Sequence, residues 1–160
     1  YKLKGEAAKP RVVDQMLGAD ISFLPELEAR GMKFTDKGVT KDAIEIIKEH
    51  GINYVRLRIF HDPSQDSGYS PKKGFCNLDY TKQMAKRVKA AGLKLLLDFH
   101  YSDTWADPQK QFKPKAWEEL EFTELTSTLK EYTNKDKNKE RLFFFKNYYE
   151  LSQIGSYVLK

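Results

Sequence analysis

Charged and aromatic side chains follow three apolar stretches of this sequence, and their types are those that bind sugars. The stretches end in LGAD, YVRLR and LLLDFHYSDTW. Aspartate and arginine side chains hydrogen-bond hydroxyl groups, and tryptophan offers a flat apolar face on which a sugar ring can stack. A phosphate site would favour a glycine-rich loop, which the sequence lacks. The candidate residues for substrate binding are Asp20, Arg58, Asp98, His100, Asp103 and Trp105.

These side chains need a scaffold that brings them together, and the sequence alternates strand-like with helix-like segments three times. The strand-like segments are residues 16–22, 52–60 and 93–102. The helix-like segments are residues 40–51, 78–92 and 121–133. This alternation predicts an α/β fold of βαβ units around a parallel sheet. The spacing of apolar residues predicts helix faces formed by Ala43, Ile46, Ile47 and His50, by Tyr80, Met84, Val88 and Ala91, and by Phe122, Leu125, Leu129 and Tyr132.

The carboxyl ends of parallel strands meet at one edge of a sheet, where the following loops converge. The loops after the second and third strands, residues 61–78 and 102–120, are long, and long loops on a regular scaffold are often functional. They carry Tyr69, Trp105 and Trp117 as candidates for stacking on a sugar, although Trp117 fits a packing role under its loop equally well. The sequence therefore predicts a site at this edge.

Several other classes of protein fit this sequence poorly. The net charge of +5 lies mostly in residues 133–160, which hold five lysines and one arginine against three acidic residues, and no nucleic-acid-binding module accompanies them. No apolar run approaches the roughly 18 residues of a membrane-spanning helix. The histidines and the single cysteine lack metal-ligand spacing, so we expect no metal site. The chain begins at Tyr1, and we expect a signal peptide to be absent or already removed.

Long motifs in the sequence resemble the N-terminal part of the family 53 glycoside hydrolases, the arabinogalactan endo-β-1,4-galactanases. The motifs are GADIS, HGINYVRLRIFHDP, KRVKAAGLKLLLDFHYSDTWADPQKQFKPKAW and LEFTELTSTLKEYT. The resemblance runs from about residue 14 to about residue 133, which corresponds to the first third or so of the family's catalytic domain. It implies the first three or so units of an incomplete (β/α)8 TIM barrel over residues 1–133.

The resemblance also implies a function, with β-1,4-galactan or arabinogalactan of pectin side chains as the substrate. Such an enzyme cleaves the chain with two carboxylates, retains the anomeric configuration and needs no cofactor. A secreted or cell-surface location is expected from the family, and neither nucleic acid nor a membrane is expected as a partner.

The two catalytic glutamates of the family have no counterpart in these 160 residues. In SQIGSYVLK, Ser156 and Tyr157 stand where the family has the Asn and Glu of its acid/base motif, and the strand that carries the nucleophile is missing. Residues 134–160 are basic and divergent, which indicates a disturbed reading frame or a truncated gene. We therefore expect an inactive fragment. The alternatives are a non-catalytic carbohydrate-binding or interaction fragment and an unrelated α/β protein that binds a small anion.

The candidate residues also have ordinary structural explanations. The resemblance assigns Arg58 to orienting the nucleophilic carboxylate, whereas an unremarkable arginine there would pair with an aspartate. We leave Arg56 open between a site role and a structural role, on the view that it points away from Arg58. His100 lies two residues after Asp98 and therefore on the same face of its strand, yet a lone histidine there is often a packing residue. Asp103 either shapes a sugar subsite or caps a turn.

Overall fold

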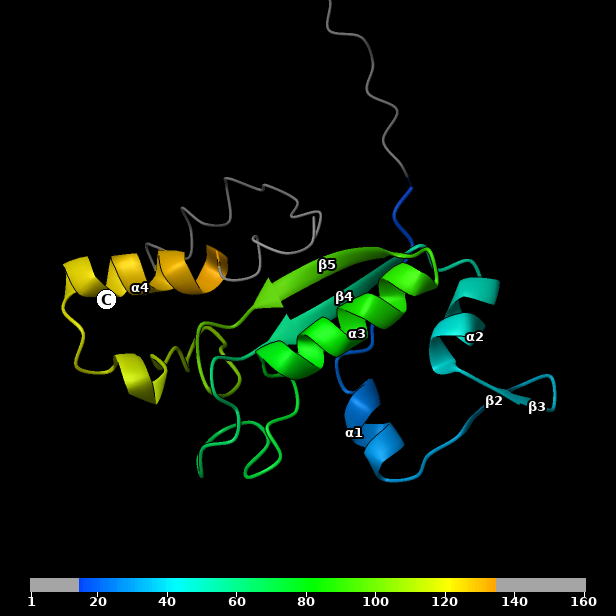
Figure 1. The fold of residues 1–160 in the computed structure, drawn as a ribbon, viewed down its shortest axis with the longest axis horizontal. Coiled ribbons are helices and arrows are strands. Elements are labelled where there is room, and N and C mark those ends of the chain that lie inside the picture. The colour runs from blue at the N-terminus through cyan, green and yellow to red at the C-terminus, as the bar shows by residue number, and fades with distance from the viewer. Residues whose placement is uncertain (1–14, 135–160) are drawn as a thin grey trace, which may run out of the picture.

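The computed structural model describes residues 15–134, and its centre is a sheet of three parallel strands (Figure 1). The strands are β1 (Gly18–Asp20), β4 (Tyr54–Ile59) and β5 (Lys94–Phe99), in the order β1–β4–β5. The register places Asp20 opposite Arg56 and Arg58 opposite Asp98. The parallel sheet predicted from the sequence is confirmed, and its carboxyl end carries the candidate residues.

Three helices cover one face of the sheet: α1 (Leu24–Ala29), α2 (Ala43–Glu49) and α3 (Leu78–Ala90). Side chains of β4 that point toward the helices are fully buried, as Val55 at 0% and Leu57 at 1% exposure show. They pack with Met84 and Val88 of α3 and with Ile44 of α2. Because each fully buried side chain of this size contributes about 1.5–3 kcal/mol, this cluster fixes the register of the strands.

Two of the helices differ from the sequence prediction in the side chains that they bury. In α2, Ile44 is buried at 2% exposure, whereas His50 lies past the helix end, is exposed, and contacts Asp36 at 3.1 Å. The expected place of His50 on the buried face is therefore wrong. Helix α4 (Phe122–Asn134) forms as predicted, but none of its side chains is buried among the described residues, and Phe122 is 60% exposed.

A hairpin of β2 (Phe34–Asp36) and β3 (Val39–Lys41) lies between α1 and α2, at the end of the molecule opposite α4 (Figure 1). The sequence analysis did not predict it. Its turn residues Lys37 and Gly38 both have positive φ, at 49° and 81°. Glycine adopts this conformation at little cost but lysine does so rarely, so the turn lacks the usual Asn-Gly signal.

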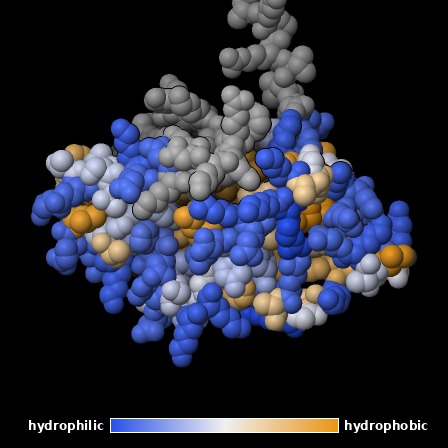
Figure 2. Space-filling model, in the orientation of Figure 1, coloured by the Kyte–Doolittle hydropathy of each residue, from blue (hydrophilic) through white to orange (hydrophobic). Residues whose placement is uncertain are grey.

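The surface seen in Figure 2 is mostly hydrophilic, with small separate hydrophobic spots, two of them near the ends that carry α4 and the hairpin. Exposed Phe122 and Val39 belong to these two elements. Within residues 15–134, no helix is both long and apolar enough to cross a membrane. The predicted divergence of residues 134–160, including Ser156 and Tyr157, falls almost entirely outside the described residues.

Candidate functional site

A row of alternating charges crosses the carboxyl ends of the three strands. Arg56 donates from Nη1 to Oδ2 of Asp20 at 2.8 Å and from Nη2 to Oδ2 of Asp98, so one guanidinium joins β1 to β5. Arg58 reaches the same Asp20 oxygen at 3.5 Å. The view that Arg56 points away from Arg58 is wrong, because side chains two residues apart in a strand share a face.

Asp20 is held in place by the turn that follows β1. Its Oδ1 accepts the Ser22 backbone N–H at 3.0 Å and the Ser22 hydroxyl at 2.5 Å. The same hydroxyl oxygen accepts the backbone N–H of Arg58 at 2.8 Å. Ser22, which sequence reasoning missed, therefore ties the end of β1 to the carboxyl end of β4 and fixes the position of the carboxylate.

The guanidinium of Arg58 is buried and has few hydrogen-bond partners among the described residues. Arg58 is 6% exposed, and its Cζ lies 3.8 Å from the ring centre of Trp105 and 6.0 Å from that of Tyr69. Its Nε has no hydrogen-bond partner among the described residues, and its contact with Asp20 is long. A buried cation of this kind has donors available for an anionic or hydroxyl oxygen.

Asp98 and His100 form the second part of the site. The imidazole Nε2 lies 3.1 Å from Oδ2 of Asp98, as the shared strand face predicted. Burial raises the pKa of Asp98, but the hydrogen bond from His100 and the electrostatic interactions with His100, Arg56 and Arg58 outweigh burial and hold this pKa below its ordinary value. Asp98 is therefore a carboxylate that stays ionised.

Asp98 should make the stability of the fold depend on pH. Because its pKa is lower in the folded chain, ionised Asp98 stabilises the fold above the ordinary carboxyl pKa of about 3.9, and this contribution is lost as the pH falls through the folded-state pKa. We expect Asp98→Asn to have a lower Tm than wild type at pH 7. The difference in Tm between the two chains should become smaller below about pH 4. Thermal unfolding followed by circular dichroism between these pH values measures this.

The exposed Asp66 provides a control for that experiment, since Asp66→Asn removes one carboxylate without removing a buried contact. Its Tm should follow wild type at every pH. A difference between Asp98→Asn and wild type that stayed constant into acid would contradict the role given to the Asp98 carboxylate.

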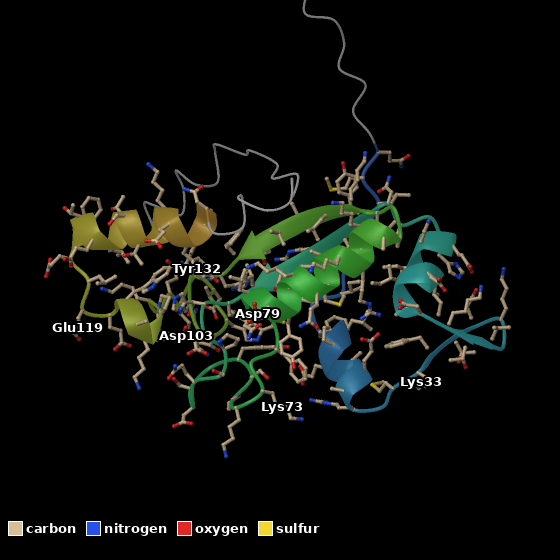
Figure 3. The ribbon with its side chains drawn as sticks, viewed as in Figure 1. Lys33, Lys73, Asp79, Asp103, Glu119 and Tyr132 are labelled. Carbon is tan, nitrogen blue, oxygen red and sulfur yellow. The ribbon has the colours of Figure 1, made fainter. Side chains whose placement is uncertain are left out.

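Asp103 is buried near the start of the loop of residues 102–120 (Figure 3). Its Oδ1 accepts the backbone N–H of Asp62 at 2.9 Å, and its Oδ2 accepts that of Lys115 at 2.8 Å. Its backbone carbonyl accepts the N–H of Tyr69 at 2.9 Å, and His61 Nδ1 lies 3.5 Å from Oδ1. These contacts join two loops, a role that the turn-capping interpretation of Asp103 did not include, and they leave its carboxylate few free positions for a sugar.

The loop of residues 61–78 is folded by local contacts of its own. Asp62 Oδ1 accepts the Ser64 N–H at 3.1 Å, and its Oδ2 accepts the Gln65 amide at 2.6 Å. A Cβ at Gly68 would lie 2.4 Å from the Pro63 carbonyl oxygen, so only glycine fits there without movement. The loop is thus shaped before any ligand arrives.

The three aromatic candidates have different environments. Trp105 is 47% exposed and presents a free face, whereas Trp117 is 4% exposed and packs edge-on against His61 and Tyr132, with ring centres 4.7 and 5.6 Å away. The packing interpretation of Trp117 therefore fits its position. Tyr69 donates its hydroxyl to Glu26 at 3.2 Å and lies edge-on to Trp105.

Phe60 and Tyr132 belong to this aromatic cluster but were not proposed as site residues from the sequence. Phe60 is fully buried, and its ring centre lies 4.9 Å from Tyr69, 5.0 Å from His100 and 6.0 Å from Trp105. Tyr132 of α4 donates its hydroxyl to the Phe60 carbonyl at 3.1 Å (Figure 3). The FHDP motif after β4 was the signal that could have identified Phe60.

A cavity of about 460 Å³ lies beside Asp98 and His100, between β5, the loop after it and α4. Its wall is mainly apolar, with Phe99, Tyr101, Phe112, Leu125 and Leu129 among the lining residues. Among residues 15–134, no cluster of three or more histidine, cysteine or acidic side chains could hold a metal. The site offers charged hydrogen-bonding groups and an aromatic face.

The chain is similar to known proteins over most of its described length. The model of glycosyl hydrolase family 53 matches residues 16–141. An arabinogalactan endo-β-1,4-galactanase of Cellvibrio japonicus is 43% identical over 118 residues, and an endo-β-1,4-galactanase of Bacillus subtilis is 40% identical over 127 residues. These matches cover 73% and 79% of this chain and 30% of each relative, so the chain spans under a third of their length.

Solved structures agree with this match. The family 53 catalytic domain of Ignisphaera aggregans superposes with a TM-score of 0.69 and 42% identity, over 74% of this chain and 33% of that one. The prediction of an incomplete (β/α)8 barrel made of the first units of the fold is confirmed, and its three parallel strands are those that position the site. The chain belongs to glycosyl hydrolase family 53.

Proposed function

We propose that this chain forms one wall of the galactan-binding site of an arabinogalactan endo-β-1,4-galactanase. The observation that carries this proposal is the half-exposed indole of Trp105, stacked on the buried Arg58 guanidinium beside Asp98 and His100. An indole face receives the apolar face of a galactose ring, and the charged groups around it receive hydroxyls. The retaining reaction of the intact enzyme uses two carboxylates from other strands.

Asp20 and Asp98 serve as supporting charges in this proposal. A general acid in a glycosidase needs a raised pKa, so that it holds a proton to give to the leaving group. The pKa of Asp98 is lowered, and Asp20 is paired with both arginines. Neither carboxylate is suited to protonate a glycosidic oxygen. Their task is to fix the guanidinium groups of Arg56 and Arg58.

The proposed substrate indicates the location in which the protein would act. β-1,4-Galactan of pectin side chains lies outside cells, so we propose a secreted or cell-surface location, with neither nucleic acid nor a membrane as partner. No cofactor is needed, because protonation and covalent capture are both carried out by carboxyl groups.

Trp105→Ala should weaken binding of the chain to β-1,4-galactan. Covering the exposed half of an indole contributes about 2 kcal/mol, which is roughly thirtyfold in Kd. Affinity electrophoresis in a gel that contains galactan measures the change. Phe122→Ala is the matched control, because Phe122 is an aromatic residue with 60% exposure that is not among the residues lining the cavity beside Asp98 and His100. Equal retardation of the two variants would contradict the proposal that the Trp105 indole is a stacking face for the sugar.

We expect the 160-residue polypeptide itself to release no reducing sugar from galactan, because the resemblance to the family implies no counterpart of either catalytic glutamate in it. Release that is lost in the Trp105→Ala variant would show that this polypeptide supplies catalytic carboxylates of its own.

A further inference from the structure

His100 has one hydrogen-bond partner at each of its two ring nitrogens. The backbone N–H of Ala106 donates to Nδ1 at 3.2 Å, and Nε2 lies 3.1 Å from Oδ2 of Asp98. The side chain is 11% exposed. Both ring nitrogens are therefore engaged, one by the strand and the other by the loop that follows it.

These two contacts assign the proton of the neutral imidazole. A backbone N–H can only donate, so Nδ1 must be the unprotonated acceptor. The proton then resides on Nε2 and points at the Asp98 carboxylate, which can only accept while it is ionised. The reverse tautomer would place two donors face to face at Ala106 and two acceptors face to face at Asp98.

The Ala106 amide is the peptide group that directly follows Trp105. We propose that His100 is a positioning residue whose Nδ1 anchors this amide and thereby holds the Trp105 ring over the Arg58 guanidinium. The ring centres of Trp105 and His100 lie 5.6 Å apart, nearly perpendicular, so the imidazole also supports the edge of the indole. The relevance to sugar binding rests on the proposed function, but the arrangement itself does not.

Protonation of His100 would break the anchor. The imidazolium has a donor at Nδ1, which can no longer accept the Ala106 N–H. The contact between His100 and Ala106 therefore requires the neutral ring, whereas the donor at Nε2 is present in both forms of the imidazole.

Two variants distinguish the effect of the contact at Nδ1 from the effect of the contact at Nε2. The side-chain oxygen of asparagine occupies the place of Nδ1, so His100→Asn keeps an acceptor for Ala106 and loses the donor to Asp98. The side-chain amide of glutamine reaches the place of Nε2, so His100→Gln keeps the donor and loses the acceptor. Tryptophan fluorescence with acrylamide quenching reports the indoles, and a Trp105→Phe chain supplies the Trp117 signal for subtraction.

We expect Trp105 in His100→Asn to match wild type, and in His100→Gln to show red-shifted emission and stronger quenching. The 15N spectrum of the wild-type imidazole at pH 8 should show the proton on Nε2. A proton on Nδ1, or a perturbed His100→Asn beside an unperturbed His100→Gln, would each overturn the proposal. No sugar is used, so this test can fail independently of galactan binding.

Discussion

Replacing Asp103 with alanine is expected to lower the free energy of unfolding by about 3–5 kcal/mol, because two hydrogen bonds to a charged group are lost and their donors are left in a buried position. Asp103 is 8% exposed, and its oxygens accept backbone N–H groups from Asp62 and Lys115, which belong to different loops. Among residues 15–134, no other side chain accepts a hydrogen bond from these two amides. Both loops should loosen together.

Urea unfolding followed by circular dichroism measures this loss, and Asp107→Ala is the matched control. Asp107 also accepts two backbone N–H groups, from Gln109 and Lys110 at 2.8 and 3.0 Å, but it is exposed and closes only its own turn. Water replaces those bonds, so we expect a change below about 1 kcal/mol. Equal losses in the two variants would contradict the role of burial in the Asp103 contacts.

The strands and the strand-end site were predictable because they depend on local patterns. Val55 and Leu57 alternate with Arg56 and Arg58, which is the pattern of a strand with one buried face and one polar face. The same period of two places Asp98 and His100 on one face. It also requires Arg56 and Arg58 to share a face, so the wrong orientation given to Arg56 came from misapplying a rule that the sequence already supplied.

Contacts between distant segments could not be read from local patterns. Asp103 has the composition of a sugar-binding residue, and only the approach of Asp62 and Lys115 reveals its role as a link between loops. The exposure of Trp105 and the burial of Trp117 depend likewise on how their loop turns around His61 and α4. Two tryptophans in one loop look equivalent in sequence, yet Trp105 is exposed and Trp117 is a buried packing residue.

The last prediction tests whether this chain can serve as part of an active galactanase. The endo-β-1,4-galactanase of Bacillus subtilis is 40% identical to it over 127 residues, so these residues can be exchanged to give a chimera that retains the rest of the relative. We expect the chimera to release reducing sugar from β-1,4-galactan. An inactive but folded chimera that still binds galactan would favour the non-catalytic carbohydrate-binding alternative.

Arg58→Ala in this chimera should reduce kcat by about 10²–10³-fold, the usual effect of removing one buried electrostatic donor from an active site. The reason is that the Arg58 guanidinium is buried at the site with its Nε unpaired among the described residues, and is thus available to hold a carboxylate of the remaining barrel. KM should change less, because the stacking face of Trp105 remains. Arg87→Ala is the control, since Arg87 pairs with Glu28 and Asp42 among the helices that cover the opposite face of the sheet. If Arg87→Ala reduced kcat as much as Arg58→Ala, the effect of Arg58 would be one of folding, and its proposed role beside the reacting carboxylates would be wrong.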